Sequence, residues 1–579
     1  MSDVAEHGSQ SAEETPWWRG AVIYQVYPRS FADDDGDGTG DLAGVRARLP
    51  YLAELGVDAL WFNPWYPSPM ADGGYDVADY RGVAPEFGTL AGAEKLITDA
   101  LELGIRTIVD IVPNHVSSEH AWFRAALASP TAPERELFWF RPGRGPGGEL
   151  PPNNWVSEFH GSAWTRTTDP DGTPGDWYLN LFDSRQPDLN WAHPQVRQEH
   201  EEVLRFWFDR GASGVRIDSA ALLEKDPALP DLVPDATAEP EGTDGPAQPE
   251  GTAGAAGPEG AAEPTRPHPY IDRDGLHTIY RSWRAIADSY PDPRVLIGEI
   301  WLPDTERFAR YLRPDELHTA FNFDFLSCPW EPIRLRASIE ATLAAHAPVA
   351  APATWVLANH DVTRTVTRYG RADTSFGFAT KARGVPTDLA LGTRRARAAA
   401  LLTLALPGAV YIYQGEELGL PEVEDIPPDA IQDPMALRSG GTSPGRDGCR
   451  VPLPWSGSEP PYGFSPVGAT APPWLPQPTD WADRTAYAQI GEADSMLELY
   501  RTAIRVRRAE PSLGDGDLTW LPGAPDQVLA FSRGNTFACV VNLGPDPVDL
   551  PNHDSILLAS SPLPPAHHLP TDTAVWLRL

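Results

Sequence analysis

One stretch, Gly214-Val215-Arg216-Ile217-Asp218-Ser219-Ala220, indicates how the chain folds. Its apolar residues alternate with polar ones, as on a short strand. Residues two apart share a face of a strand, so Arg216 and Asp218 point to the same side. The guanidinium can hold the carboxylate ionised and oriented, as a carboxylate nucleophile requires. Taken alone, the tripeptide is better explained as a buried structural ion pair, and the rest of the chain reverses that interpretation.

Strand-like stretches recur along the chain, and helix-like periodicity separates most of them. The eight expected strands cover residues 21–26, 59–62, 107–112, 214–218, 295–300, 319–325, 354–357 and 410–413. The main expected helices cover residues 42–55, 91–103, 194–210, 274–290 and 393–406. Strands that alternate with helices are typical of parallel α/β folds, and eight such strands predict a (β/α)₈ TIM barrel.

The chain is too long for one ordinary domain, and changes in composition suggest its divisions. The barrel is expected in residues 17–113 and 191–510, with an inserted subdomain B, rich in Pro, Gly and Trp, at residues 114–190. Short alternating runs predict a C-terminal antiparallel β domain over residues 511–579. Residues 1–16 are expected to be a disordered tail, and residues 231–266 a disordered low-complexity loop.

Composition excludes several classes of partner. The 46 Lys and Arg residues face 81 Asp and Glu residues, which gives a net charge of −35. Such a balance argues against nucleic acid or an anionic membrane as partner and suits a neutral ligand. The 20 Trp, 17 Tyr and 19 Phe residues could stack on sugar rings, although most aromatic residues in proteins are core residues.

The cysteines and the apolar segments predict a cytoplasmic protein. Three cysteines, Cys328, Cys449 and Cys539, lie far apart, with neither disulfide nor zinc spacing. Residues 1–14 lack the apolar core of a signal peptide. The longest apolar runs, such as residues 398–406, are too short to span a bilayer. The oligomeric state is left open by the sequence.

Polar residues gather at the carboxyl ends of four expected strands. The third strand ends in Asp110-Ile111-Val112-Pro113-Asn114-His115, and the seventh in Asn359-His360-Asp361. The fourth ends in Asp218, and the fifth in Glu299. These ends meet at one face of a barrel, where active sites lie. Because such charges are costly in an apolar core unless they are paired, the sequence predicts one shared polar pocket.

These motifs, in this order, resemble glycoside hydrolase family 13, the α-amylase superfamily, and within it the α-glucosidase and oligo-1,6-glucosidase branch. The resemblance extends from Trp17 to about Trp455 and continues more weakly to the C-terminus. Beside the four strand ends it includes a motif at the end of the inserted segment, Gln186-Pro187-Asp188-Leu189-Asn190.

The resemblance implies a role for each acid. Asp218 would be the nucleophile, Glu299 the general acid and base, and Asp361 the carboxylate that stabilises the transition state. A retaining glycosidase needs one ionised and one protonated carboxyl group, roughly 5–5.5 Å apart. Arg216 would favour an ionised Asp218, and apolar neighbours of Glu299 would raise the pKa of that carboxyl.

The resemblance also implies a set of substrate-binding residues. His115 and His360 would hydrogen-bond sugar hydroxyls in the first subsite. Asp72 and Tyr75 lie in a loop that lines this subsite in the family, and Arg446 would pair with Asp72 to close the pocket in exo-acting members.

Three further positions bear on the pocket of this family. Phe159 and Phe182 match aromatic residues of the family pocket, although a place in the subdomain core explains them nearly as well. Ser219 follows the nucleophile where relatives that prefer α-1,6 linkages tend to carry Val, so it favours α-1,4 or broad specificity.

A loop rich in aspartate is the predicted metal site. Asp33, Asp35, Asp37 and Asp41 alternate along residues 33–41, and the Thr39 carbonyl lies among them. Oxygen ligands on a loop bent by glycines suit a hard cation such as Ca²⁺. A solvated acidic turn is the alternative, but it would crowd like charges without a counter-ion. The resemblance supports a structural calcium, and no organic cofactor is expected.

The sequence therefore predicts a retaining, exo-acting α-glucosidase that releases glucose from the non-reducing end of short α-glucosides through a covalent intermediate. Three alternatives stay open. The same residues could serve a transglucosylase, or an oligo-1,6-glucosidase or trehalose-cleaving enzyme. A catalytically inactive scaffold is the third, and it is disfavoured because all three acids are present.

Overall fold

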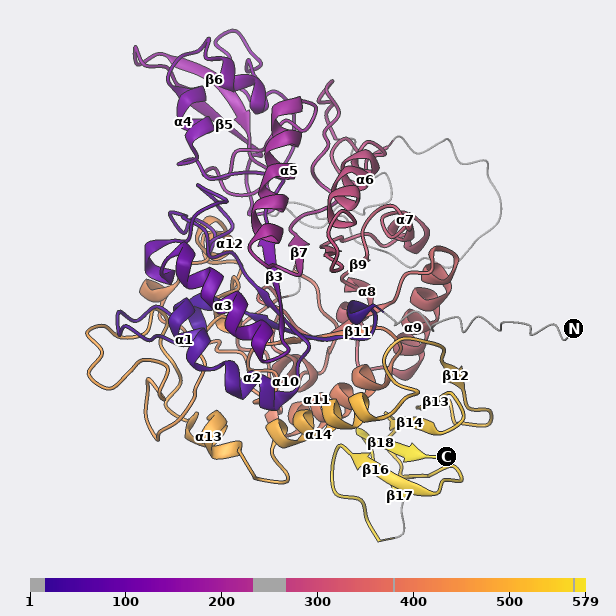
Figure 1. Cartoon of the computed structure of the whole chain (residues 1–579). Helices are drawn as coiled ribbons and strands as arrows, with labels where there is room; N and C mark the ends of the chain where they lie inside the picture. The colour runs from indigo at the N-terminus through magenta and orange to yellow at the C-terminus, as the bar shows by residue number, and fades with distance from the viewer. Residues whose placement is uncertain (1–15, 233–266, 379–380, 566–567) are drawn as a thin grey trace, which may run out of the picture.

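The computed structural model describes residues 16–232, 267–378, 381–565 and 568–579 (Figure 1). The two segments expected to be disordered, residues 1–16 and 231–266, therefore lie outside the described residues except at their edges. At one edge, Asp231 and Leu232 are hydrogen-bonded to Asn154, so these two residues belong to the ordered part. Within the described ranges, we find no helix long and apolar enough to cross a membrane.

Eight parallel strands form the central sheet, in the order β10-β11-β1-β2-β3-β7-β8-β9. They are β1 (Val22–Val26), β2 (Ala59–Phe62), β3 (Arg106–Ile111), β7 (Gly214–Ile217), β8 (Val295–Gly298), β9 (Thr319–Ala320), β10 (Thr354–Val356) and β11 (Ala409–Tyr413). The two outer strands of this order approach each other, since the Thr354 hydroxyl donates to the Ala320 carbonyl over 2.5 Å. The sheet is thus a nearly closed barrel, and the predicted fold class is confirmed.

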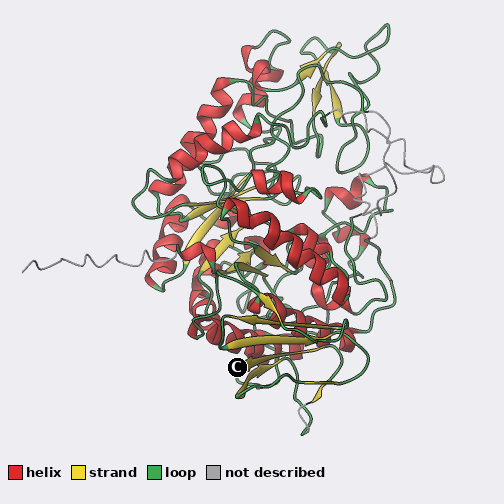
Figure 2. Ribbon diagram, turned by 90° about the vertical axis from the view of Figure 1, so that its right-hand side faces the viewer, coloured by secondary structure: helices red, strands yellow, loops and turns green. Residues whose placement is uncertain are grey.

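Helices cover the outside of the barrel (Figures 1 and 2). The longer ones are α3 (Leu90–Glu102), α5 (Pro194–Asp209), α6 (Leu276–Ala287), α9 (Pro332–His346), α11 (Leu389–Ala405) and α14 (Met496–Ala509). The shorter helices of the barrel and its loops are α1 (Leu42–Ala47), α2 (Leu49–Leu55), α7 (Thr305–Arg310), α8 (Phe323–Ser327), α10 (Thr365–Tyr369), α12 (Pro434–Arg438) and α13 (Ala486–Gln489), whereas α4 (Ala121–Leu127) lies in the inserted segment (Figure 1). Side-chain caps start several of them. The Asp388 carboxylate, for example, accepts the Leu391 amide proton at the start of α11.

Two elements differ from the prediction. The helix expected over residues 42–55 is two helices, because Pro50 lacks an amide proton and restarts the helix in the first turn of α2. The strand expected over residues 319–325 stops at Ala320, and α8 follows it. There the Asn322 side chain accepts the Phe325 amide proton and caps α8. This local cap overrides the alternating apolar pattern of the segment.

Two apolar layers bury both faces of the barrel strands. Alternate residues such as Ile23, Trp61 and Ile297 pack inside the barrel. Their neighbours on β1, Val22 and Tyr24, pack outward against the helices. Because both faces are covered, every residue of β1 is buried, as expected for a parallel strand.

Smaller antiparallel sheets lie at the two opposite ends of the molecule (Figure 1). After β3 comes a three-stranded antiparallel sheet of β4 (Phe140–Arg141), β6 (Pro174–Leu179) and β5 (Trp164–Thr168). At the C-terminus a five-stranded antiparallel sheet has the order β12-β13-β14-β18-β16, and β15 (Val548–Asp549) pairs with β17 (His568–Leu569). The five strands are β12 (Thr519–Trp520), β13 (Val528–Arg533), β14 (Phe537–Asn542), β18 (Thr573–Arg578) and β16 (Ser555–Ala559).

The C-terminal sheet is docked firmly on the barrel. Its strand β18 packs on α11, and the Trp576 indole donates a proton to the Leu401 carbonyl over 3.0 Å. Trp576 is fully buried by this contact. The C-terminal sheet therefore shares an apolar core with the barrel helices and is not an independent unit joined only by a linker.

Candidate active site

One buried guanidinium joins three carboxylates at the centre of the barrel mouth. Arg216 is 1% exposed. Its Nη1 lies 3.0 Å from Asp110 Oδ1 and 2.7 Å from Asp218 Oδ1. Its Nη2 lies 2.6 Å from Glu299 Oε2. The ion pair between Arg216 and Asp218, which the sequence predicted, is therefore part of a larger charged cluster.

Strand register explains why these residues meet. Asp110 on β3 is directly opposite Arg216 on β7, and Ile217 is opposite Gly298 on β8. Asp218 and Glu299 each follow the end of their strand, so both lie at the carboxyl-terminal edge. The Ser219 backbone amide, at a positive φ of 47°, donates to Glu299 Oε2 over 3.0 Å and fixes the two strand ends together.

Asp361 follows the end of β10, and its carboxylate contacts three cationic or polar side chains. Its Oδ1 is 2.8 Å from Arg450 Nη2 and 3.2 Å from Arg446 Nη1. Its Oδ2 is 3.3 Å from His360 Nε2. The side chains of Asp218, Glu299 and Asp361 retain 11–14% exposure, so each keeps limited access to solvent in an otherwise buried cluster.

The predicted pair Asp72–Arg446 is present. Arg446 Nη2 donates to Asp72 Oδ1 over 2.6 Å, and both side chains are buried. Arg446 also contacts Asp433 at 2.7 Å, and the Gln186 amide donates to Asp72 Oδ2 over 3.1 Å. These contacts tie the loop after β2, the end of the inserted segment and the loop after β11 into one closed rim.

Aromatic rings line the same site. Tyr75 stacks on His360, with ring centroids 5.2 Å apart and 8° between the planes. His115 packs against Phe182 with centroids 4.9 Å apart, and Phe182 lies 5.6 Å from Phe159. The Arg446 guanidinium lies over the Phe159 ring at 4.9 Å. Both phenylalanines from the inserted segment therefore reach the site instead of lying only in the subdomain core.

The two acids on Arg216 differ in pKa. Burial raises the pKa of Glu299 to about 7, and Arg216 only partly offsets this effect. Burial also raises the pKa of Asp218 to about 6, an effect that Arg216 and the Ser219 hydroxyl, 2.9 Å from Asp218 Oδ2, partly offset and that the neighbouring Asp110 carboxylate reinforces. The guanidinium alone would favour an ionised Asp218, so this rise was not expected from the sequence. Near neutral pH, Asp218 is still the more ionised of the two groups.

The pKa values of Asp361, His115 and His360 are lowered, in contrast to the raised values of Asp218 and Glu299. Burial by itself would raise the pKa of Asp361, but the guanidinium groups of Arg446 and Arg450 bring that pKa well below the ordinary value. Burial lowers the pKa of His115 to about 3 and that of His360 well below its ordinary value. Both imidazoles are thus neutral at physiological pH and can donate or accept one hydrogen bond at each nitrogen.

The structure adds site residues that the sequence argument did not assign. Arg450 contacts Asp361, and its place four residues after Arg446, in the stretch Arg446-Asp447-Gly448-Cys449-Arg450, could have identified it from the sequence. Asp433 holds Arg446, and no motif marked it. Asp110 lies in the motif at the end of the third strand, but the sequence assigned it no role. Its carboxylate accepts hydrogen bonds from Arg216, the Tyr75 hydroxyl and the Trp61 indole.

The acidic loop brings together three of the four carboxylates that were predicted as metal ligands. Carboxylate oxygens of Asp33, Asp35 and Asp37 all lie within 4.8 Å of one another. Asp41 instead caps α1, because its carboxylate accepts the amide protons of Gly44 and Asp34. The backbone of Thr39 donates to Asp37 Oδ1 over 2.7 Å. Convergent carboxylates on a loop fit a hard divalent cation.

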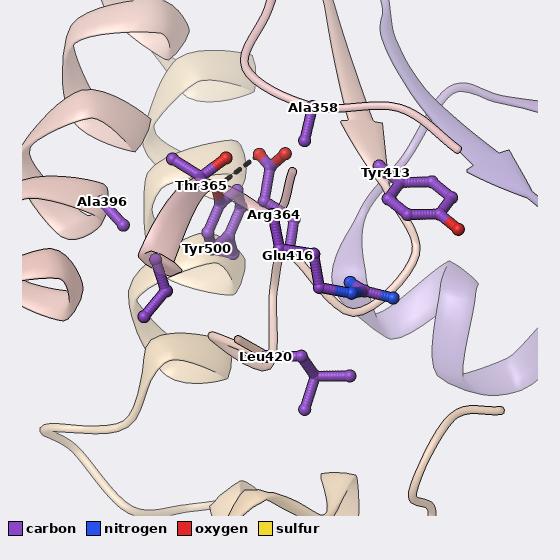
Figure 3. Close-up of a pocket in the computed structure, with 9 residues that line it drawn as sticks. Ala358, Arg364, Thr365, Ala396, Tyr413, Glu416, Leu420 and Tyr500 are labelled. Atoms are coloured by element: carbon purple, nitrogen blue, oxygen red, sulfur yellow. Dashed lines mark hydrogen bonds between the residues drawn. The ribbon is translucent and has the colours of Figure 1, made fainter. Parts of the chain in front are cut away.

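A small cavity lies among α10, α11, α14 and the loop after β11 (Figure 3). Its volume is about 10 Å³, enough for about one water and far too small for a sugar ring. Glu416 lines the cavity, and its carboxylate accepts a hydrogen bond from the Tyr500 hydroxyl over 2.7 Å. Arg364 also lines the cavity. It donates hydrogen bonds to the carbonyls of Gln414 and Cys449 and so connects the two ends of the loop after β11. This cavity is a structural feature and not the substrate site.

Comparisons with known proteins agree with this geometry. A family model described as the alpha amylase catalytic domain matches residues 25–516. A probable alpha-glucosidase of Rhizobium meliloti (strain 1021) is 37% identical over 533 residues, which cover 90% of this chain and 87% of that protein. An oligo-1,6-glucosidase of Parageobacillus thermoglucosidasius is 31% identical over 527 residues, 86% of this chain and 84% of that protein.

A solved structure extends the similarity to the whole fold. The crystal structure of an alpha-glucosyl transfer enzyme has a TM-score of 0.80 and 32% sequence identity, and the match covers 98% of this chain and 100% of that chain. Because the family model and these relatives match most of the chain, the protein belongs to the α-amylase family of glycoside hydrolases.

Proposed function

We propose that the protein is a retaining, exo-acting α-glucosidase that releases glucose from the non-reducing end of short α-glucosides. One observation carries the proposal: a single buried guanidinium, Arg216, lies 2.7 Å from Asp218 and 2.6 Å from Glu299 and so holds the two acids side by side at the strand ends. An ionised carboxylate beside a protonated one is the pair that a retaining glycosidase requires. The names of the similar proteins support an α-glucosidic substrate.

The mechanism follows from these two groups. The Asp218 carboxylate attacks the anomeric carbon of the terminal glucosyl unit, while Glu299 gives its proton to the glycosidic oxygen as the bond breaks. The product is a β-glucosyl ester on Asp218 and a free leaving-group alcohol. Water then attacks the same carbon, Glu299 takes its proton, and α-glucose is released.

Asp361 and the closed rim account for the remaining requirements. Asp361 is held ionised by its cations, so it can stabilise the positive charge that develops on the sugar ring. The Asp72–Arg446 pair would close the pocket beyond one glucosyl unit and offer both charges to its hydroxyl groups. This arrangement favours release of one glucose at a time.

Substrate specificity is tested by initial rates on maltose, isomaltose, sucrose, trehalose and maltotriose. We expect turnover of maltose and maltotriose, with glucose as the first sugar released from the non-reducing end. Release of maltose from the non-reducing end of maltotriose, or no hydrolysis of any substrate in the panel, would refute the proposed function. Faster cleavage of isomaltose or trehalose than of maltose would select one of the alternatives named from the sequence.

Transglucosylation is the second candidate, because the alpha-glucosyl transfer enzyme shares the whole fold. In that reaction a sugar hydroxyl takes the place of water at the ester on Asp218. Transfer from maltose liberates only the leaving glucose, so one new oligosaccharide for each free glucose at high maltose concentration would identify the transferase. Two free glucose molecules for each maltose consumed, with little new oligosaccharide, would identify the hydrolase.

The activity should follow a narrow bell-shaped dependence on pH. Below a pH of about 6, Asp218 becomes protonated and cannot attack, so the rate falls as pH decreases. Above a pH of about 7, Glu299 loses the proton that it must donate, so the rate falls as pH increases. The pH dependence of kcat/KM on maltose measures both limbs. A plateau extending from pH 5 to 9 would contradict the assignments.

We also propose a structural Ca²⁺ held by the carboxylates of Asp33, Asp35 and Asp37. A bound ion would offset the repulsion among these acids and stabilise the folded protein by about 2.7 kcal/mol when it is present at a hundredfold excess over Kd. We expect a chelator to lower Tm and added Ca²⁺ to restore it, whereas the Asp35→Asn variant should show a smaller response. An identical Tm with and without chelator would refute the site.

The compartment of the protein stays a prediction from its cysteines. Cys328, Cys449 and Cys539 are all buried and free, which supports a reducing compartment such as the cytoplasm.

A further inference from the structure

Trp301 is an aromatic residue in direct contact with the proposed general acid. It lies two residues after Glu299, and its indole Nε1 donates to Glu299 Oε1 over 3.3 Å. Although most tryptophans of the barrel are buried, 38% of Trp301 is exposed. Its ring stacks on Phe323, with centroids 3.6 Å apart and 12° between the planes, and Phe378 lies 5.6 Å away.

The two oxygens of Glu299 have different partners. Oε2 lies 2.6 Å from Arg216 Nη2 and accepts the Ser219 amide proton over 3.0 Å. A proton on Oε2 would face both of these donors, so the acidic proton of Glu299 belongs on Oε1. Oε1 is therefore the atom that must meet the glycosidic oxygen. A ring that reaches Oε1 lies beside the leaving group.

We propose that Trp301 positions Glu299 for proton transfer and forms the wall against which the leaving group of the substrate lies. The indole N–H holds Oε1 in place, and it favours the carboxylate that remains after the proton has been given away. The stack on Phe323 fixes the ring, so the exposed part of the indole offers a rigid apolar surface to the departing sugar. This inference rests on the proposed glucosidase activity and adds a residue to its leaving-group side.

The two roles of Trp301 can be separated by two substitutions. Trp301→Phe keeps an aromatic ring on Phe323 but removes the N–H donor, whereas Trp301→Ala removes both. Loss of the donor should raise the pKa of Glu299, move the alkaline limb of the pH profile upward by about one unit, and lower kcat on maltose by about tenfold. Loss of the ring should in addition raise KM for maltotriose.

A further substrate checks that the effect acts through Glu299. An aryl α-glucoside with a good leaving group needs little help from the acid, so Trp301→Phe should lower kcat on that substrate much less than on maltose. Trp177→Phe is the matched control, because its indole donates to the Gly148 carbonyl over 3.0 Å in the three-stranded sheet, away from the site. The control should leave both limbs and both kcat values unchanged.

The experiment measures kcat, KM and the pH profile of the wild type and the three variants, with Tm to verify folding. A shifted alkaline limb and a loss confined to maltose in Trp301→Phe support the inference. An unshifted limb in a folded Trp301→Phe variant, or an equal loss on both substrates, overturns it. A wild type that is inactive on every α-glucoside overturns the proposed function itself, which is a separate and recognisable result.

Discussion

Asp218→Asn is expected to lower kcat on maltose by on the order of 10⁶-fold, as removal of an enzyme nucleophile can do. The amide is nearly the same size as the carboxylate, but it carries no charge and forms no glucosyl ester. Arg216 keeps its contacts with Asp110 and Glu299 in the variant, so the site should remain assembled.

Stability separates this loss of activity from misfolding. Because the pKa of Asp218 is raised to about 6 in the folded state, its ionised form opposes folding at neutral pH. A neutral amide removes that cost, so Tm should be unchanged or higher. Asp549→Asn, at an exposed position in the C-terminal domain, is the control with the same chemical change and should retain full activity. More than a hundredth of the wild-type kcat in a folded Asp218→Asn variant would refute the nucleophile.

Glu299→Gln is expected to lower kcat on maltose by about 10²–10⁴-fold, the usual contribution of a general acid. Glutamine can neither give a proton to the glycosidic oxygen nor take one from water. The alkaline limb of the pH profile should disappear, because the group that titrates near pH 7 is gone. Kinetics on maltose across the pH range measure both effects.

The leaving group and an added anion distinguish the acid role from the base role of Glu299. With an activated aryl α-glucoside, the variant should form the ester on Asp218 but hydrolyse it slowly, and azide should restore turnover by giving α-glucosyl azide, since azide needs no base. Glu340→Gln, an exposed glutamate on α9, should behave like the wild type. Failure of azide to accelerate the variant, or an alkaline limb that persists, would contradict the assignment.

Most of the barrel could be predicted because buried parallel strands are short apolar runs bounded by turn residues. The sixth strand was overextended because the alternation from Thr319 to Phe325 resembles a strand, while the cap at Asn322 acts only locally. Pro50 likewise divides a helix whose apolar periodicity continues across it. In both places one residue's hydrogen-bonding capacity outweighs the apolar pattern.

The site could be predicted to the extent that its residues belong to motifs at strand ends. Asp218, Glu299 and Asp361 come from three strands, and the barrel register brings their side chains to one place. Asp433 was not predicted, because its contact with Arg446 depends on how a long loop after β11 folds back. The raised pKa of Asp218 was also missed, since the degree of burial depends on the three-dimensional packing.

The central claim, that the sugar is bonded to Asp218 between two displacements, is tested most directly by the configuration of the first product. Proton NMR recorded within the first minutes of hydrolysis of an aryl α-glucoside, before mutarotation, distinguishes the two anomers of glucose, and its leaving group adds no second glucose. Two successive displacements at the anomeric carbon predict α-glucose as the first product from the non-reducing unit. β-Glucose would show a single displacement and would contradict the covalent intermediate.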